Sequence, residues 1–380
     1  MDRIPLELQD RIISYVLADI RKNSNPYVRV PVFRLAPLAA LTRTWQRSIE
    51  RRTFRTLSIT NEDLEDFDRI VTWRHRYVRK LHFTVKFPYY DDELSKEYET
   101  NEERVANNAI ATSAVKQLFA ILSAWGSGED LELELQLSFT SPGDKVKMAE
   151  GAWPSWRGID DKRYQYSYVR LDGVEGFDKV NRVTQYTQRR GTRPFDLRSQ
   201  YDLTSRLPRA VLAIWDTIEA GPFVPSRQEL RDRFVFAIES GSDCDLPPNL
   251  HLHITVEAPN FRHNQSLPNF TAPHTTYDRV SSALRQLSVR AVKFEFSGIA
   301  DHTLLWPSPS QVQIQEPYWA SLTCLEIELS LQSPSGKWYF RGKDSNRPGD
   351  VPIPDDAEAF FAPGYYEDDD VEYIDHNQEA

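Results

Sequence analysis

The chain has 380 residues and a mass of 44.1 kDa, which allows roughly two to three domains or one elongated repeat array. Its 40% hydrophobic and 27% charged residues are typical of a globular protein and exclude wholesale disorder. No apolar run approaches the roughly 20 residues that a membrane-spanning helix needs, the first residues lack a secretion signal, and two cysteines make no disulfide framework. We therefore expect a cytoplasmic or nuclear protein without membrane association.

Charge is distributed unevenly along the chain. The net charge is −10, yet residues 1–60 hold eleven Lys and Arg against five Asp and Glu. Residues 355–380 hold ten acidic side chains and no Lys or Arg. The sequence thus has a basic head, a neutral body and an acidic end.

The head is predicted to be helical. Pro5 suits the first position of a helix, and apolar residues then recur at helical spacing: Leu8, Ile12, Ile13, Val16, Leu17 and Ile20. Residues 21–33 contain two prolines and predict a loop. Helical spacing returns with Leu38, Leu41, Trp45 and Ile49. Three short helices within residues 4–53 make a marginal core, so a remaining apolar face would need a partner to cover it.

The body alternates strand and helix signals. An apolar-x-x-apolar-x-apolar pattern predicts strands at Phe54/Leu57/Ile59, Val78/Leu81/Phe83, Val289/Val292/Phe294 and Leu322/Leu325/Ile327, and alternation predicts two more from Leu131 and Leu250. Helices are predicted over residues 63–73, 104–125, 207–218 and 277–287. The alternation favours an α/β fold, an irregular leucine-rich-repeat-like solenoid. The alternative is a compact α+β domain whose mixed sheet joins strands that are distant in sequence.

Three segments depart from this periodicity: residues 86–103, 178–206 and 260–276. Beyond Gly342 the chain is rich in Pro, Gly and acidic residues and is predicted to be a disordered tail. The predicted domains are therefore a helical unit at 1–56, an α/β body at 57–342 and an acidic tail at 343–380.

Catalytic signals are sparse. The sequence contains no phosphate-binding glycine loop, no His-Glu-x-x-His and no Gly-x-Ser-x-Gly. We interpret His251 and His253 as one solvent-facing row of a strand, and Cys324 as a small buried apolar residue. The basic cluster around Tyr186 is interpreted as solvated rather than as a nucleic-acid site; it comprises Arg182, Arg189, Arg190, Arg193 and Arg198. We expect no enzyme activity, no cofactor and no metal.

The head resembles a known motif, the F-box. Ile4-Pro5-Leu6-Glu7 is similar to its opening Leu-Pro-x-Glu step, and Leu41-Thr42-Arg43-Thr44-Trp45 is similar to its hydrophobic-basic-x-Trp segment. Ile4 replaces the usual Leu, and the loop over residues 21–33 is longer than usual. Further segments resemble a family of fungal F-box proteins of unassigned function: residues 50–60, 77–85, 118–125 and 317–340.

This resemblance implies a non-enzymatic adaptor role. F-box proteins bind the Skp-type adaptor of cullin–RING ubiquitin ligases through the F-box helices and hold a target protein with the downstream domain. Carried over, the adaptor-binding residues would be Ile4, Pro5, Leu8, Ile12, Leu38, Leu41, Trp45 and Ile49. Alternatively, the same residues close a small core within this chain. Two other functions remain open: a scaffold that acts without a ligase, and a hydrolase or transferase whose site assembles from distant residues.

Overall fold

The computed structural model describes most of the chain from residue 36 to residue 339. The described residues are 36–126, 132–144, 146–148, 157–159, 163, 167–188, 193, 195–208, 211–215, 224–240, 249–253, 269–271, 277–308, 319–330, 332–337 and 339, together with positions 5, 8, 11, 12, 14 and 15. The predicted tail at 343–380 and most of segment 260–276 lie outside the described residues.

One eight-stranded sheet organises the body. Its strands are β1 (Thr56–Thr60), β2 (Lys80–Lys86), β3 (Leu133–Thr140), β6 (Val183–Gln188), β7 (Val211–Trp215), β8 (Asn249–His253), β9 (Lys293–Gly298) and β10 (Cys324–Leu329). They lie in the order β1-β2-β3-β6-β7-β8-β9-β10, and every neighbouring pair is parallel. Only the short antiparallel pair β4 (Val146–Met148) and β5 (Arg157–Ile159) interrupts chain order, outside the sheet. The described sheet is therefore not the mixed sheet of the compact alternative.

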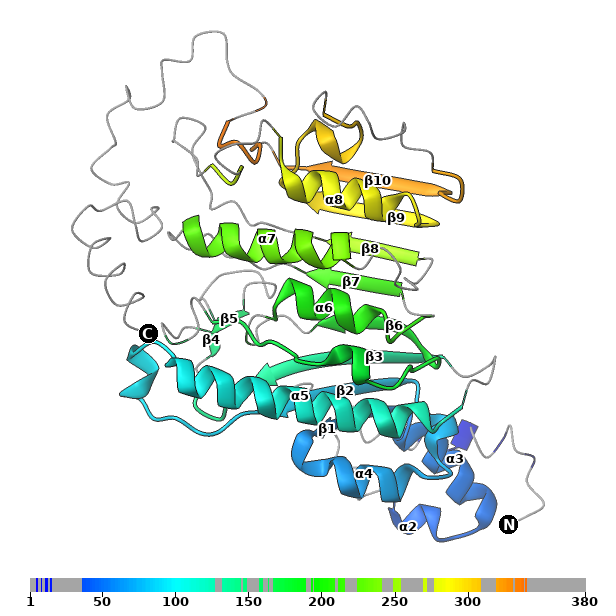
Figure 1. The fold of residues 1–380 in the computed structure, drawn as a ribbon. Coiled ribbons are helices and arrows are strands. Elements are labelled where there is room, and N and C mark those ends of the chain that lie inside the picture. Colours follow the sequence, from blue (N-terminus) through cyan, green and yellow to red (C-terminus); the bar gives the residue numbers. More distant parts are fainter. Residues whose placement is uncertain are drawn as a thin grey trace.

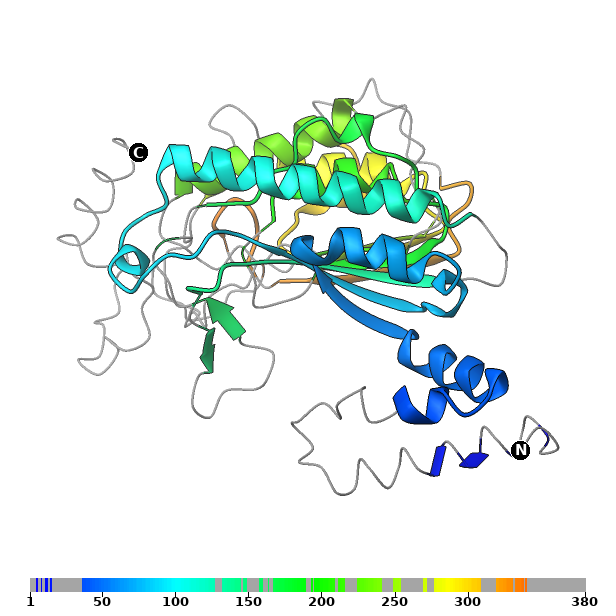
Figure 2. The ribbon, with the colours of Figure 1, turned by 90° about the horizontal axis from the view of Figure 1, so that it is seen from below.

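Helices cover one face of this sheet (Figures 1 and 2). They are α4 (Leu64–Val71), α5 (Asn101–Ser123), α6 (Leu197–Thr204), α7 (Val224–Ser240) and α8 (Arg279–Ser288), and short 3-10 turns lie at η2 (Asn61–Asp63), η3 (His75–Tyr77), η4 (Leu94–Lys96), η6 (Val174–Gly176) and η7 (His302–Leu304). At the N-terminal end, α2 (Ala36–Ala39) and α3 (Arg43–Thr53) precede β1. Each strand is followed by a connection that returns to start the next parallel strand, as βαβ units require.

The core lies between the sheet and the helices. In β2, Leu81, Phe83 and Val85 are buried, while the alternate residues of the strand are half-buried or exposed. Leu81 and Phe83 are paired in register with Leu135 and Leu137 of β3, which are also fully buried. Because side chains alternate between the two faces of a strand, the polar residues between them line the opposite face, on which none of α4–α8 lies (Figure 2).

Polar residues define where the covering helices begin. Thr100 and Glu103 form a capping box at the start of α5. Asp196 and Asp278 are the N-cap residues of α6 and α8, and each carboxylate accepts the backbone N–H of the serine three residues later. The sequence Arg-Ala-Val then recurs before or at the next strand, at 209–211 and 290–292. The two helix–strand segments thus share an N-capping Asp and an Arg-Ala-Val sequence.

Most predicted elements are confirmed. β1, β2, β3, β8, β9 and β10 and helices α4, α5 and α8 lie at or close to their predicted positions. The helix predicted over 207–218 is wrong, because residues 211–215 form β7 between β6 and β8. A strand with neighbouring strands on both sides is often a continuous run of apolar residues, and such a run also contains the spacing expected of a helix. Segment 178–206 was predicted as irregular but contains β6 and α6, and α7 was not predicted.

Membrane-spanning helices were also sought in the structure. Within the described part of the chain, no helix combines the length and the apolar character needed to cross a bilayer.

Candidate protein-interaction surfaces

Helix α3 is the best-defined part of the head. It begins at Thr42, whose Oγ1 accepts the backbone N–H of Trp45 at 3.2 Å. One face of the helix is buried and comprises Trp45, Ser48, Ile49 and Glu50. The opposite face is basic and exposed, with Arg43, Arg47 and Arg51. α3 therefore packs inward on one side and presents positive charge on the other.

The eight predicted adaptor-binding residues divide into two groups. Pro5, Leu8, Ile12 and Leu41 are exposed, and Leu8, Ile12 and Leu41 have exposed fractions of 50%, 41% and 49%. Trp45 and Ile49 are buried, at 8% and 3%. Leu38 lies in α2, but its side chain is outside the described part of the structure, as is all of Ile4. The buried pair packs α3 onto its own chain, and the exposed group is accessible to a second protein.

The exposed apolar residues of the first segment share one helical face. The described positions 8, 11, 12, 14 and 15 are helical, and Leu8, Ile12 and Tyr15 are spaced i, i+4 and i+7. Tyr15 is 65% exposed. Arg52 of α3 donates a hydrogen bond to Ser14 Oγ at 2.7 Å. This hydrogen bond connects Ser14 to α3, while Leu8, Ile12 and Tyr15 are exposed.

Arg74 connects the head to the body. Its guanidinium forms an ion pair with the buried Glu50 of α3 (Nη2–Oε1 3.1 Å) and lies 4.3 Å from the ring centroid of Trp73. Its Nη1 donates to the Ile70 carbonyl of α4 at 2.9 Å. The Arg55 carbonyl, between α3 and β1, accepts the N–H groups of the two residues that lead into β2. These contacts fix the orientation of the head relative to the sheet.

The basic cluster predicted to be solvated is partly buried, so that prediction is wrong. Arg182 and Arg193 are 1% and 3% exposed, and Tyr186 is fully buried. Arg198 is half-buried and lies 3.5 Å from Asp202, and Arg189 and Arg190 lie outside the described residues. Burial of these guanidinium groups is offset by partners that are distant in sequence, a feature that sequence spacing does not show.

The two buried arginines bind backbone and aromatic groups from distant segments. Arg182 donates from Nη2 to the carbonyls of His75 and Val78, at 2.6 and 3.2 Å, and lies 5.2 Å from the Trp125 ring. Burial, together with the charge of Arg79, lowers the pKa of Arg182 to about 10. Arg193 pairs with Glu99, in the segment 86–103 that was predicted to be irregular. Both residues therefore join parts of the chain that the sequence leaves unconnected.

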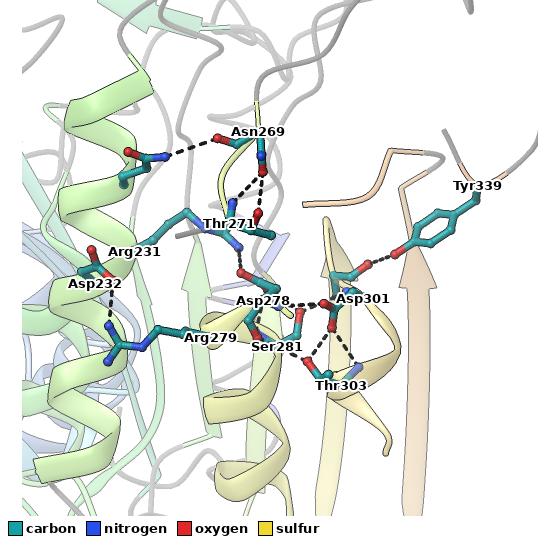
Figure 3. A network of polar contacts seen from close by, with 12 residues as sticks. Arg231, Asp232, Asn269, Thr271, Asp278, Arg279, Ser281, Asp301, Thr303 and Tyr339 are labelled. Carbon is teal, nitrogen blue, oxygen red and sulfur yellow. Dashed lines mark hydrogen bonds and ion pairs between the residues drawn. The ribbon is translucent and has the colours of Figure 1, made fainter. Parts of the chain in front are cut away.

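A second polar cluster joins α7, α8 and the segment after β9 (Figure 3). Asp278 accepts a hydrogen bond from Arg231 Nη2 of α7 at 2.6 Å, and its second oxygen accepts from Ser281 N and Oγ. Asp301 accepts from Asp278 N and from Thr303 N, at 2.7 and 2.8 Å. Each of the two carboxylates accepts three of the described hydrogen bonds, so the cluster acts as a structural connection between the last helices and strands.

The depression beside this cluster is small. It holds about 60 Å³ and is lined by Gln228, Arg231, Asp232, Val235, Phe270, Asp278, Arg279 and Val280. Small-molecule sites usually have volumes of about 300–1,000 Å³. The described residues also contain no group of three or more His, Cys, Asp or Glu that could hold a metal ion.

The remaining residues considered from the sequence lie apart from one another. His251 and His253 are on β8, but their side chains are outside the described part of the structure. Cys324 begins β10 and is half-buried, so its predicted full burial is wrong: β10 is an edge strand and receives cover from one side only. Two tryptophans near the end of the sheet also lie apart: Trp306 is 57% exposed, and Trp319 donates its indole N–H to Ser288 Oγ at 3.0 Å.

The helix-free face of the sheet carries rows of polar residues. In register across the strands, Lys80 is opposite Glu134 and Thr84 is opposite Ser138. Lys80 Nζ lies 2.5 Å from Glu134 Oε1, and the two hydroxyls of Thr84 and Ser138 are 2.7 Å apart. This face of the sheet therefore carries polar side chains that pair across neighbouring strands.

Comparison with known proteins adds no assignment. No protein-family model, no curated protein and no solved structure matches this chain.

Proposed function

We propose that this chain is the substrate-recognition subunit of an SCF-type cullin–RING ubiquitin ligase. The N-terminal helices dock as an F-box onto a Skp-type adaptor, and an irregular leucine-rich-repeat-like solenoid binds a target protein. The observation that carries the proposal is the outward apolar face of the head, formed by Leu8, Ile12 and Tyr15 and accompanied by Leu41. Exposed apolar side chains on one helical face are typical of a protein-binding site.

Two further features support the proposal. The basic face of α3 complements an acidic partner and would accelerate association more than it increases affinity. The parallel strands follow one another in chain order and helices lie on one face of the sheet (Figure 2), which supports the proposed leucine-rich-repeat-like body. The buried Trp45 and Ile49 have a supporting role, since they hold α3 in place while exposed residues make the contact.

Co-purification with a fungal Skp-type adaptor tests this function. The double variant Leu8→Asp/Ile12→Asp alters exposed side chains, so the fold is retained while an apolar interface would receive two charges. A matched control is Val105→Asp on α5, because Val105 is 66% exposed and lies on a different helix. We expect the double variant to lose the adaptor and the control to retain it.

Two outcomes contradict the proposal. Equal recovery of the adaptor with the double variant and with the wild type would show that the apolar face is not the docking surface. Recovery with neither protein would remove the adaptor role. Adaptor binding without recruitment of a cullin would instead favour a ligase-independent scaffold.

A further inference from the structure

Among the described strands, none lies beside the outer edge of β10. β10 is the last strand of the sheet, and within the described residues it pairs only with β9. Cys324 and Ser330 donate their N–H groups to the carbonyls of Val292 and Gly298, on the β9 side, at 3.4 and 2.8 Å. Because hydrogen bonding alternates along a parallel strand, the N–H and C=O groups of residues 325, 327 and 329 point to the open edge. These groups can pair with another extended chain.

The side chains of β10 form two rows of different chemistry. Leu325, Ile327 and Leu329 are paired with Phe294, Phe296 and Gly298 of β9. Leu325 and Leu329 are nevertheless 45% and 46% exposed, whereas Phe294 and Phe296 are buried beneath the helical layer. The described residues place no helix after β10 to cover this row.

The opposite row is acidic. Glu326 and Glu328 are both exposed, and Glu326 lies directly opposite Glu295 of β9. Lys293 forms an ion pair with Glu295, and Glu328 accepts a hydrogen bond from Ser297 at 3.3 Å. Among the described residues, the carboxylates of Glu295, Glu326 and Glu328 lie at this corner of the sheet with the ammonium group of Lys293, and like charges directly opposite each other are unfavourable.

We propose that the edge of β10 binds an extended segment of a partner protein in which basic and aliphatic residues alternate. The partner adds a strand to the sheet through the backbone groups of residues 325, 327 and 329. Its aliphatic side chains cover Leu325, Ile327 and Leu329, and its Lys or Arg side chains lie beside Glu326 and Glu328. The segment is on the order of six residues long, the length of β10.

The acidic row discriminates against two other occupants. A second copy of this chain paired through β10 would place its own Glu326 and Glu328 beside the same residues, which like-charge repulsion disfavours. The tail of this chain carries five acidic side chains within residues 367–372 and is disfavoured for the same reason. In the ligase role proposed above, which this inference extends, the basic segment belongs to the target protein.

A peptide-binding experiment on the full chain tests the inference. The probe is a fluorescein-labelled peptide, Lys-Val-Lys-Ile-Lys-Val-Lys, measured by fluorescence anisotropy. The control peptide has the same residues with the lysines in one block, which cannot place charges and aliphatic groups on opposite faces of a strand. We expect the alternating peptide to bind at least about tenfold more tightly than the block peptide, since only the former matches both rows.

Charge reversal identifies the site of binding. Glu326→Lys/Glu328→Lys is expected to weaken binding of the alternating peptide at least about tenfold and to create binding of Glu-Val-Glu-Ile-Glu-Val-Glu. The matched control Glu93→Lys/Glu97→Lys makes the same change in net charge at exposed residues around η4 and should leave binding unchanged. Equal effects of the two variants would overturn the proposal, because they would indicate non-specific attraction.

Hydrogen exchange reports on the backbone contact. In the free chain the amides of residues 325, 327 and 329 should exchange fast, and saturating peptide should slow them, while those of 326 and 328 stay protected throughout. Slow exchange at the odd positions in the free chain would show that the tail or a second copy already occupies the edge, and the proposal would be wrong. So would a lack of binding at peptide concentrations on the order of 1 mM. The adaptor is absent from all of these experiments, so a negative result for the β10 edge does not bear on the proposed F-box function.

Discussion

Removal of the Asp278 carboxylate provides the sharpest stability test of the structure. Asp278 is 2% exposed and accepts hydrogen bonds from Arg231 and from Ser281 at the start of α8. Loss of an N-cap costs about 1 kcal/mol, and removal of one partner of a buried ion pair costs about 3–5 kcal/mol. Since one carboxylate serves both roles, we expect Asp278→Ala to lower the free energy of unfolding by about 4 kcal/mol.

Two related variants separate these contributions. Arg231→Met leaves Asp278 with its two Ser281 donors and the positive end of the α8 dipole, so we expect a smaller cost of about 2 kcal/mol. Asp278→Asn keeps a side chain that caps helices well but removes the charge, and should fall between the other two variants.

The double variant Arg231→Met/Asp278→Ala tests the coupling directly. It leaves no unpaired buried charge, so its cost should be below the sum of the single costs by about 2 kcal/mol. Urea unfolding of the full chain, followed by circular dichroism, measures these values, and hydrogen exchange in α8 localises the effect. Costs that add to within about 0.5 kcal/mol would refute the reasoning, since independent sites behave in that way.

Three further predictions concern other buried or half-buried charges. A double-mutant cycle with Glu50→Gln and Arg74→Met should give a coupling energy of about 1 kcal/mol in urea unfolding, because both side chains are largely shielded from water. A coupling energy of zero would mean that this ion pair does not hold the head against the body. Burial raises the pKa of Glu103, but the hydrogen bonds from Thr100 and the charge of Arg163 lower it more, so the net pKa lies below 4.5. The contribution of ionised Glu103 to the free energy of unfolding is therefore complete above pH 4.5 and is lost as pH falls through the lower folded-state pKa. Glu103→Gln should flatten this acid dependence, which urea unfolding at a series of pH values measures. An unchanged profile would contradict the prediction. Arg182→Lys should cost about 2 kcal/mol, since an ammonium does not reproduce the planar contact with Trp125 and the donation to two carbonyls; unaltered thermal unfolding would count against this role.

The local sequence pattern was sufficient to predict those elements in which each side chain lies either on the buried face or on the exposed face. β2 and β3 alternate apolar and polar residues because one face meets the helices and the other does not. α5 was predicted from residue 104, and the structure begins it three residues earlier, after Thr100, whose capping box with Glu103 fixes the start of the helix. The outward apolar residues Leu8 and Ile12 were also accessible to sequence reasoning, since helical spacing places them on one face.

Other features depend on neighbours that are distant in sequence. Residues 211–215 form a strand because β6 and β8 satisfy their backbone on both sides, and no local spacing distinguishes this from a helix. Arg182 is buried because carbonyls more than one hundred residues earlier accept its hydrogen bonds. Which of the head residues face inward was decided by the packing of α3, which encloses Trp45 and leaves Leu41 outside.

The sequence by itself thus determined the type of architecture and the amphipathic character of its elements, because both follow from periodicities that act within a few residues. Only the tertiary structure decided the order of the strands, the burial of Arg182 and Arg193 and the position of β10 at the edge of the sheet. Those properties arise from which surfaces meet, and the free energy of such contacts is set by partners far away along the chain.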